Sequence, residues 1–214
     1  RDRSYRELER LYLKERERLG FDLEEFVEAH FSDPGSPASN FQTDMSRDMY
    51  AHISAMWNVL MRGPDTLNPN TSRIPLPNPY IVPGGRFKEI YYWDSYFTMI
   101  GLVADDRMEI ARDMMGNFAH LIDSLGFIPN GTRDYYLTRS QPPFFAMMVD
   151  MIEAKDSSLQ GHYFPHVARE YEYWMEGSDL LSEGQVANRA FRANEAGYMN
   201  RFWDTASTPR PESY

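Results

Sequence analysis

The sequence contains no cysteine in its 214 residues. Disulfide bonds, thiolate metal sites and a cysteine nucleophile are therefore excluded for these residues, although this absence does not choose between cell compartments. Long apolar runs are also missing, and none has the length needed to cross a bilayer. The first twenty residues mix both charge signs densely, unlike a secretory signal peptide. These absences predict a soluble chain without a membrane partner.

A surplus of positive charge is missing as well. Lysine and arginine number 22 against 32 aspartates and glutamates, which gives a formal net charge of −10. No stretch concentrates basic residues, so a nucleic-acid backbone is a poor partner and a neutral ligand fits better. Aromatic residues, in contrast, are abundant at 14%. They concentrate in residues 90–97, "IYYWDSYF", which place one aspartate inside a wall of rings.

Hydrophobic periodicity predicts a chain of helices, and convincing strand alternation is found nowhere. The fold class expected is therefore all-α. A proline-rich segment, residues 65–85, is too broken for a helix or a central strand and reads as a long loop of the kind that is often functional. The expected helices cover residues up to about 19, 21–31, 46–60, 88–104, 106–125, 142–152 and 166–177.

These helices alternate in character along the chain. Residues 88–104 are apolar nearly all the way round, whereas residues 106–125 carry a one-sided apolar stripe that Gly126 closes. The next two helices repeat this alternation. In the second of them the charged residues lie opposite an apolar face formed by Val167, Tyr171, Trp174 and Met175. The pattern predicts inner helices shielded by outer ones, with the loops that enter the inner helices, 81–87 and 128–143, lying together.

Unusual polar residues gather in these two loops and near the C-terminal end. A polyhydroxylated ring is held by guanidinium groups, carboxylates, carboxamides and aromatic faces, and all four kinds of group are present here. A sugar is therefore the expected ligand. For each residue taken singly, the alternative to a binding role is a structural one, in a salt bridge or a helix cap. The candidates are Arg86, Asp94, Asn130, Arg139, Gln141, Arg210 and Glu212, beside Trp93, Tyr135, Tyr136 and Phe144.

Signals for a metal or a phosphate are weak. His162 and His166 have the spacing of a helical metal pair, but Pro165 lies between them and no third ligand is indicated. The stretch "GGRF" lacks the glycine pattern and the following lysine of a phosphate loop. No metal site is predicted.

Two stretches, "PGGRFKEIYYWDSYFTMIGL" from Pro83 and "RSQPPFF" from Arg139, resemble the signature sequences of trehalases, glycoside hydrolase family 37. The resemblance covers nearly the whole chain, because three further stretches occur in the family's order: the earlier "GFDLEEFV", then "PNGTRDYYLTRSQPPFFAMMV" and "NRFWDTASTPRPESY". It implies an (α/α)6 barrel that hydrolyses α,α-trehalose to two glucose molecules with inversion and without a cofactor. Residues 1–214 would form about the first half of this catalytic domain, with 1–45 as an N-terminal helical extension and 46–214 as barrel helices and sugar-binding loops.

The resemblance also implies roles for single residues. Asp94 would accept hydrogen bonds from sugar hydroxyls while Trp93 encloses the ring, which explains an aspartate among so many aromatic side chains. The family's sugar-binding positions fall on Arg86, Trp93, Asp94, Asn130, Arg139, Ser140, Gln141, Arg210 and Glu212.

The catalytic carboxylates do not fall within this sequence. Inverting hydrolysis needs a carboxylic acid for the leaving oxygen and a carboxylate that activates water. In trehalases the acid is an aspartate in a "GWDFSSRW"-like stretch beyond "PRPES", and the base is a later glutamate. We therefore expect both groups beyond Tyr214, and neither Asp94 nor Asp204 replaces them, because their surroundings match other segments of the family.

Two hypotheses from different classes remain open at this point. The first is the substrate-holding portion of an inverting trehalase, with trehalose or glucose as the ligand and the missing C-terminal portion of the same protein as a candidate partner. The second is a non-catalytic carbohydrate-binding or regulatory protein derived from a trehalase. The compartment stays open between periplasmic or secreted and cytoplasmic. Half a barrel is expected to expose a contiguous apolar surface.

Overall fold

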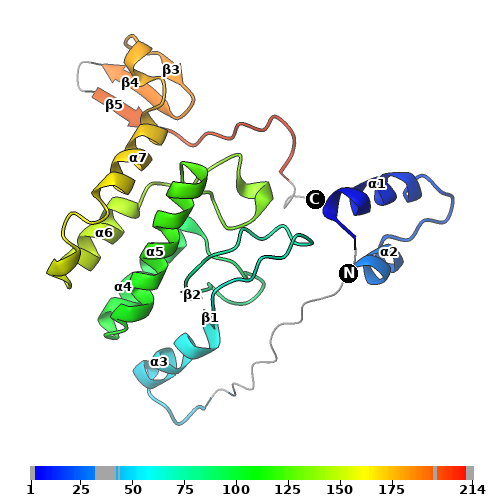
Figure 1. The fold of residues 1–214 in the computed structure, drawn as a ribbon, viewed down its shortest axis with the longest axis horizontal. Coiled ribbons are helices and arrows are strands. Elements are labelled where there is room, and N and C mark those ends of the chain that lie inside the picture. Colours follow the sequence, from blue (N-terminus) through cyan, green and yellow to red (C-terminus); the bar gives the residue numbers. More distant parts are fainter. Residues whose placement is uncertain (1–2, 32–41, 43, 195–196, 211–214) are drawn as a thin grey trace.

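The computed structural model describes residues 3–31, 42, 44–194 and 197–210, and this part of the chain is mostly helical (Figure 1). In the described residues no helix combines the length and apolar character that a membrane span requires. The α-helices are α1 (Tyr5–Glu15), α2 (Leu23–His30), α3 (Met49–Leu60), α4 (Tyr92–Ala104), α5 (Met108–Leu125), α6 (Phe145–Glu153) and α7 (Phe164–Met175), joined by the short 3-10 helices η1 (Asp134–Tyr136), η2 (Ser157–Leu159) and η3 (Ser178–Leu180).

Two small antiparallel sheets depart from the all-α expectation. The first pairs β1 (Met61–Arg62) with β2 (Tyr80–Ile81), and the second orders β3 (Val186–Ala187), β4 (Ala190–Asn194) and β5 (Gly197–Asn200). Ala187 pairs with Ala190 across a tight turn in which Asn188 has a φ of 44°. Strands of two to five residues are too short to show a clear period of two, which is why the sequence pattern did not indicate them.

Helix α5 forms the centre of the core. It packs against α4, α6, α7 and β2. The predicted stripe is confirmed, and Gly126, with a φ of 83°, ends the helix in a left-handed conformation. Its buried side chains include Ala111, Met114, Met115, Phe118, Leu121 and Ile122.

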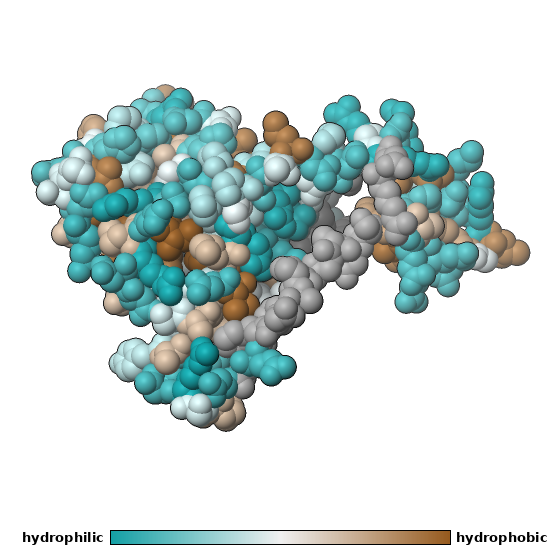
Figure 2. Space-filling view, turned by 60° about the horizontal axis from the view of Figure 1, so that its bottom comes forward, coloured by the Kyte–Doolittle hydropathy of each residue, from teal (hydrophilic) through white to brown (hydrophobic). Residues whose placement is uncertain are grey.

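Helix α4 differs from the fully buried helix that its composition predicts. It begins at Tyr92 rather than Lys88, and only one side of it is buried, through Tyr92, Ser95, Met99 and Leu102. On the other side Trp93, Phe97 and Ile100 are 41%, 56% and 43% exposed. Apolar side chains also reach the surface at several places on the face shown in Figure 2. These side chains lie in separate places on that face, and the contiguous apolar surface expected of half a barrel stays a prediction.

The first two helices form a hairpin that lies apart from the rest of the described chain in Figure 1. Helix α1 ends at Glu15, earlier than the predicted end near Leu19. Asp22 caps α2 by accepting hydrogen bonds from the amides of Glu24 and Glu25 at 2.8 and 3.1 Å. The predicted helices around residues 21–31 and 46–60 are confirmed as α2 and α3.

The last two helices carry prolines at their starts in different ways. Helix α6 begins two residues after Pro143, whereas Pro165 lies in the first turn of α7, where a missing amide proton costs nothing. The buried positions of α7 are Glu170 and Trp174, four residues apart. Tyr171, expected on the buried face, is instead 64% exposed. A glutamate therefore occupies a core position that the sequence pattern had assigned to the polar side.

Candidate functional site

The candidate site is built around the first turn of α4. The amide of Tyr92 donates to the carbonyl oxygen of Asn130 at 3.2 Å, and the amide of Trp93 donates to Oε1 of Gln141 at 2.9 Å. A helix start leaves amides without partners, so Gln141 acts as a cap from a distant loop. This contact brings the predicted residues Trp93, Asp94, Asn130 and Gln141 together.

The loop from residue 128 to 141 is folded tightly against that helix start. Asn130 donates its amide to the carbonyl oxygen of Arg139 at 3.0 Å. Ser140 is buried and donates its hydroxyl to the carbonyl oxygen of Ile128 at 2.6 Å. This bond makes Ser140 a structural support for the loop. A Cβ at Gly131 would lie 3.0 Å from the ring of Tyr136, so the close approach requires glycine.

Two arginines converge on one carboxylate beside this loop. Arg139 is only 2% exposed, and its Nη1 lies 3.4 Å from Oδ2 of Asp204. Nε of Arg210 lies 3.9 Å from the same oxygen. The Arg139 guanidinium also faces the ring of Tyr136, with 5.1 Å from its central carbon to the ring centroid. Asp204 thus pairs with two guanidinium groups, that of the buried Arg139 and that of the exposed Arg210.

Asp204 stays ionised in this setting. Burial raises its pKa, but hydrogen bonds from the Ala206 amide and the Thr138 hydroxyl, together with the positive Arg139 and Arg210, lower that pKa below its usual value. Sequence reasoning had set Asp204 aside as a catalytic group without finding its role as an arginine anchor. The signal was hard to find, because the backbone bridge between Arg139 and Asp204 joins segments 65 residues apart.

The remaining predicted residues lie at the edges of this group or outside the described chain. Arg86 is exposed on the turn between Gly84 and Phe87, with its guanidinium carbon 5.0 Å from the Phe87 ring centroid. The rings of Phe87, Tyr91 and Tyr136 follow one another at 5.4 and 5.6 Å, which links this turn to the Arg139 loop. Glu212 lies outside the described residues, so its predicted position is not tested.

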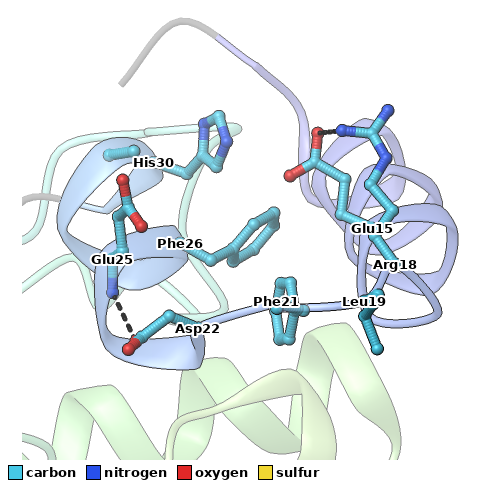
Figure 3. Close-up of a pocket in the computed structure, with 10 residues that line it drawn as sticks. Glu15, Arg18, Leu19, Phe21, Asp22, Glu25, Phe26 and His30 are labelled. Carbon is cyan, nitrogen blue, oxygen red and sulfur yellow. Dashed lines mark hydrogen bonds and ion pairs between the residues drawn. The ribbon is translucent and has the colours of Figure 1, made fainter.

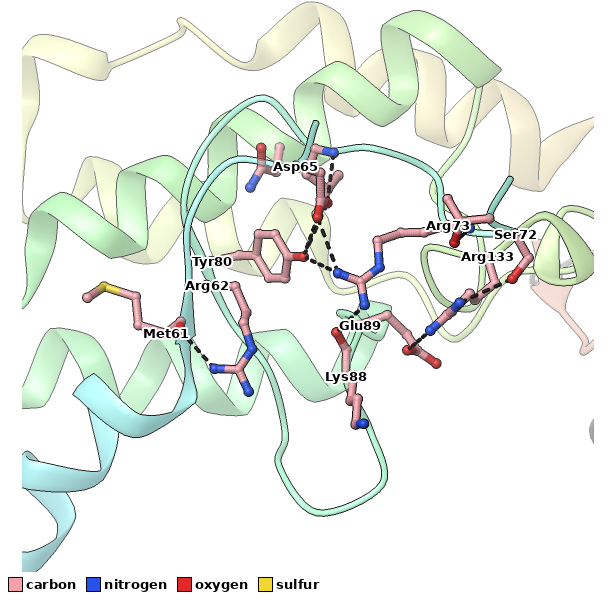
Figure 4. Close-up of polar contacts among 12 residues, drawn as sticks. Met61, Arg62, Asp65, Ser72, Arg73, Tyr80, Lys88, Glu89 and Arg133 are labelled. Atoms are coloured by element: carbon pink, nitrogen blue, oxygen red, sulfur yellow. Dashed lines mark hydrogen bonds and ion pairs between the residues drawn. The ribbon is translucent and has the colours of Figure 1, made fainter. Parts of the chain in front are cut away.

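The proline-rich loop is fixed by a partly buried carboxylate, Asp65 (Figure 4). Its oxygens accept hydrogen bonds from the Tyr80 hydroxyl at 3.0 Å and from Nη1 of Arg73 at 3.2 Å. Arg73 also donates to the carbonyl oxygen of Lys88 at 3.2 Å. Burial and then the negative Asp65 raise the pKa of Tyr80 to about 12, so its hydroxyl remains a donor. The loop is a rigid support.

A second carboxylate, the buried Glu89, ties this support to the site (Figure 4). It pairs with Nη2 of Arg133 at 3.0 Å and accepts from the Tyr91 hydroxyl at 2.8 Å. Arg133 in turn donates to the Ser72 hydroxyl at 3.1 Å. Sequence reasoning missed Asp65, Glu89 and Arg133. For Glu89 and Arg133 the available signal was a charged residue within or beside the aromatic stretches "KEIYYW" and "TRDYY".

A pocket in the N-terminal hairpin is less suited to a ligand. It has a volume of about 320 Å³ and lies between α1 and α2 (Figure 3). Its polar groups already have local partners: Glu15 pairs with Arg18 at 3.7 Å, and Asp22 caps α2. Figure 3 shows Phe21 and Phe26 between the two helices, where they form the small core of the hairpin. The described residues also contain no cluster of three or more side chains that could hold a metal ion.

Comparison with known proteins decides the family. A family model described as Trehalase matches residues 2–214. The chain belongs to the trehalase family. The geometry around α4 is therefore that of a trehalase family member.

Individual relatives support this membership. The chain is 47% identical over 204 residues to a periplasmic trehalase of Pseudomonas aeruginosa, covering 95% of this chain and 37% of that protein. It is 47% identical over 207 residues to one of Xanthomonas axonopodis pv. citri and 44% over 205 residues to one of Escherichia coli O139:H28, each time covering 95% of this chain and 36% of the relative. The chain therefore spans little more than a third of the length of these relatives.

A solved structure also resembles it. The neutral trehalase of Saccharomyces cerevisiae aligns with a TM-score of 0.47 and 36% identity, covering 52% of this chain and 22% of that one.

Proposed function

We propose that this chain supplies the substrate-holding part of a hydrolase that cleaves α,α-trehalose into two glucose molecules with inversion. The observation that carries this proposal is the convergence of Arg139 and Arg210 on Asp204, beside the loop whose Gln141 caps the Trp93 amide next to Asp94. Such a group offers donors, acceptors and an aromatic face within one region, as recognition of a sugar ring requires. Membership of the trehalase family supports trehalose as that sugar.

Each residue has a role in this proposal. Asp94 accepts hydrogen bonds from sugar hydroxyls, and Trp93 covers the apolar face of the ring. The arginines donate to hydroxyl oxygens, while Asp204 keeps two of them in place. Ser140 acts indirectly by holding its loop. The proposed substrate-binding set, in which Ser140 is the loop support, is Arg86, Trp93, Asp94, Asn130, Arg139, Ser140, Gln141, Arg210 and Glu212.

We place the catalytic acid and base outside residues 1–214. The reaction requires two carboxyl groups about 6.5–9.5 Å apart, with one protonated near neutral pH. Asp204 is unsuited to be that acid because two arginines favour its ionised form. The relatives have nearly two thirds of their length outside the matched region, which leaves ample room for both groups.

The same proposal covers the architecture and the compartment. Residues 46–214 would form the first half of an (α/α)6 barrel, with residues 1–45 as a helical extension. The exposed side of α4 with Trp93, Phe97 and Ile100 would then face the barrel interior. The relatives' names indicate a periplasmic location for those proteins, and we propose the same compartment for this one. Cell fractionation tests this location directly.

A chimaera tests the function. Residues 1–214 are fused to the remaining C-terminal length of the Pseudomonas aeruginosa relative, and glucose release from trehalose is assayed for the fusion and for each part alone. The proposal predicts activity in the fusion only, lost again on changing Arg139→Ala. Activity in residues 1–214 alone would show that the catalytic carboxylates lie within this chain. Trehalose binding by residues 1–214 with an inactive, folded fusion would favour the rival, a non-catalytic sugar-binding protein.

A further inference from the structure

A carboxylate without an ion-pair partner is buried between helices directly behind the candidate site. Glu170 on α7 is 5% exposed, and Tyr92 on α4 is 1% exposed. The Tyr92 hydroxyl donates a hydrogen bond to Oε1 of Glu170. In the part of the chain that the structure describes, Glu170 forms no ion pair with a lysine, arginine or histidine. Burying a carboxyl group in this way is unfavourable, so an apolar residue would serve better if packing were its only task.

The Tyr92 hydroxyl makes a second contact that extends this pair to a third helix. It accepts a hydrogen bond from the amide of Phe145, the first residue of α6, at 2.9 Å. Tyr92 is itself the first residue of α4. One hydroxyl group therefore fixes the starts of two helices relative to α7. We call Glu170, Tyr92 and the Phe145 amide the buried clamp.

The residues next to the buried clamp are those of the candidate site. Trp93 and Asp94 follow Tyr92 directly, and Phe144, beside Phe145, lies 6.3 Å from the Trp93 ring between centroids. The backbone amide of Tyr92 bonds Asn130, and that of Trp93 bonds Gln141. A displacement of Tyr92 with its backbone would therefore shift groups of three different site segments at once.

We propose that Glu170 is a positioning residue for the sugar site: by accepting the Tyr92 hydrogen bond it holds the starts of α4 and α6 in register, and with them Trp93 and Gln141. This inference rests on the proposed function for its ligand, but the geometry of the buried clamp can be tested without it. The hydrogen bond of Glu170 within the described residues goes to Tyr92, through which Glu170 acts on the site.

The test compares Glu170→Leu with Glu172→Leu, a change at an exposed position two residues along the same helix. Leucine fills a similar volume but cannot accept a hydrogen bond from the Tyr92 hydroxyl. In Glu170→Leu we expect the Phe145 amide proton to exchange with solvent at least ten times faster than in the wild type, and trehalose to bind at least ten times more weakly. In Glu172→Leu we expect the exchange rate and the trehalose affinity of the wild type. Glu170→Gln keeps an acceptor oxygen and is expected to restore both properties to within about threefold.

Two outcomes would overturn the inference. One is unchanged Phe145 exchange and unchanged trehalose affinity in a folded Glu170→Leu protein, which would make Glu170 a simple core residue. The other is a Glu170→Gln protein as impaired as the leucine variant. If Glu170→Leu does not fold, Tyr92→Phe removes the same hydroxyl with the ring retained and should show the same two losses. A third outcome separates the two proposals. If the Phe145 amide exchanges faster in Glu170→Leu but the wild type itself binds no trehalose, the buried clamp is supported and the proposed function is refuted.

Discussion

Helix α4 presents two faces that are similar in apolar content but different in burial. Tyr92, Met99 and Leu102 lie in the core, whereas Trp93 and Phe97 on the opposite side reach the surface. Composition alone treats both faces as core. The difference arises because one face packs on α5 and α6, while the other begins at Trp93 beside the loop that carries Gln141. Rings beside polar loops, rather than rings as such, distinguish the proposed binding face from the packing face.

The largest expected effect separates the two faces by stability. Leu102→Ala leaves a cavity in the core and should lower the free energy of unfolding by about 2–5 kcal/mol. Ile100→Ala on the exposed face should cost less than about 1 kcal/mol. Urea unfolding followed by circular dichroism measures both. Equal losses would mean that the exposed face is also packed in solution.

The buried face also predicts a pH dependence through Glu170. Burial raises its pKa to about 7, partly opposed by the Tyr92 hydrogen bond, from an ordinary value of 4.5. The folded state then binds the proton more tightly, so the stability that Glu170 contributes is present below pH 4.5 and is lost as the pH rises through 7.

Replacing the titrating group should remove this loss. The unfolding free energy of Glu170→Gln, relative to wild type, should increase from pH 5 to pH 8 by on the order of 3 kcal/mol. Parallel denaturation curves at the two pH values measure the difference. A constant offset between the two proteins would contradict a raised pKa.

On the side of the exposed face, Arg139 should govern ligand affinity. Arg139→Ala removes charge-assisted donors and should weaken trehalose binding by about 1.5–3 kcal/mol, and Arg139→Lys should be nearly as harmful because an ammonium group lacks the planar fork. Calorimetric titration measures the affinity. Arg169→Ala is the matched control, since Arg169 pairs with Asp123 at 2.9 Å on an exposed surface. Near-normal affinity in both Arg139 variants would remove this residue from the site.

The smallest expected effect on stability comes from Asp94. It is exposed in the first turn of α4, where a negative charge favours the helix by about 0.3–1 kcal/mol. Asp94→Asn should therefore change the unfolding free energy by less than about 1 kcal/mol while weakening trehalose binding. Thermal unfolding and titration of one preparation give both numbers. A large stability loss with unchanged affinity would assign Asp94 to the fold instead.

Sequence reasoning predicted the helices well where one face repeats apolar residues at helical spacing. The stripe of α5, its end at Gly126, and the starts of α2 and α3 all follow from local chemistry. The strands from Val186 to Asn200 were missed, because strands of two to five residues joined by tight turns carry little periodic signal. The exposure of one side of α4 depends on which neighbours are present, which no local pattern encodes.

The candidate site was less predictable from the sequence than the helices were. The resemblance indicated Trp93, Asp94 and Arg139, and the structure brings them to one region together with Gln141. The anchors behind them could not be inferred in the same way. Glu89, Asp204 and Glu170 hold partners 44, 65 and 78 residues away in the chain. Such long-range contacts follow from the assembled fold alone.

The most direct test of the account uses the indole signals of the four tryptophans during a trehalose titration followed by nuclear magnetic resonance. Trp93 lies at the proposed site, whereas the Trp57 indole donates to Asp105 at 2.7 Å on the other end of α4. The account predicts that the Trp93 signal shifts in a saturable manner while the Trp57 signal stays in place. A Trp93 signal that does not move as trehalose binds, or that moves no more than Trp57, would contradict the assignment of the exposed face of α4 to the sugar.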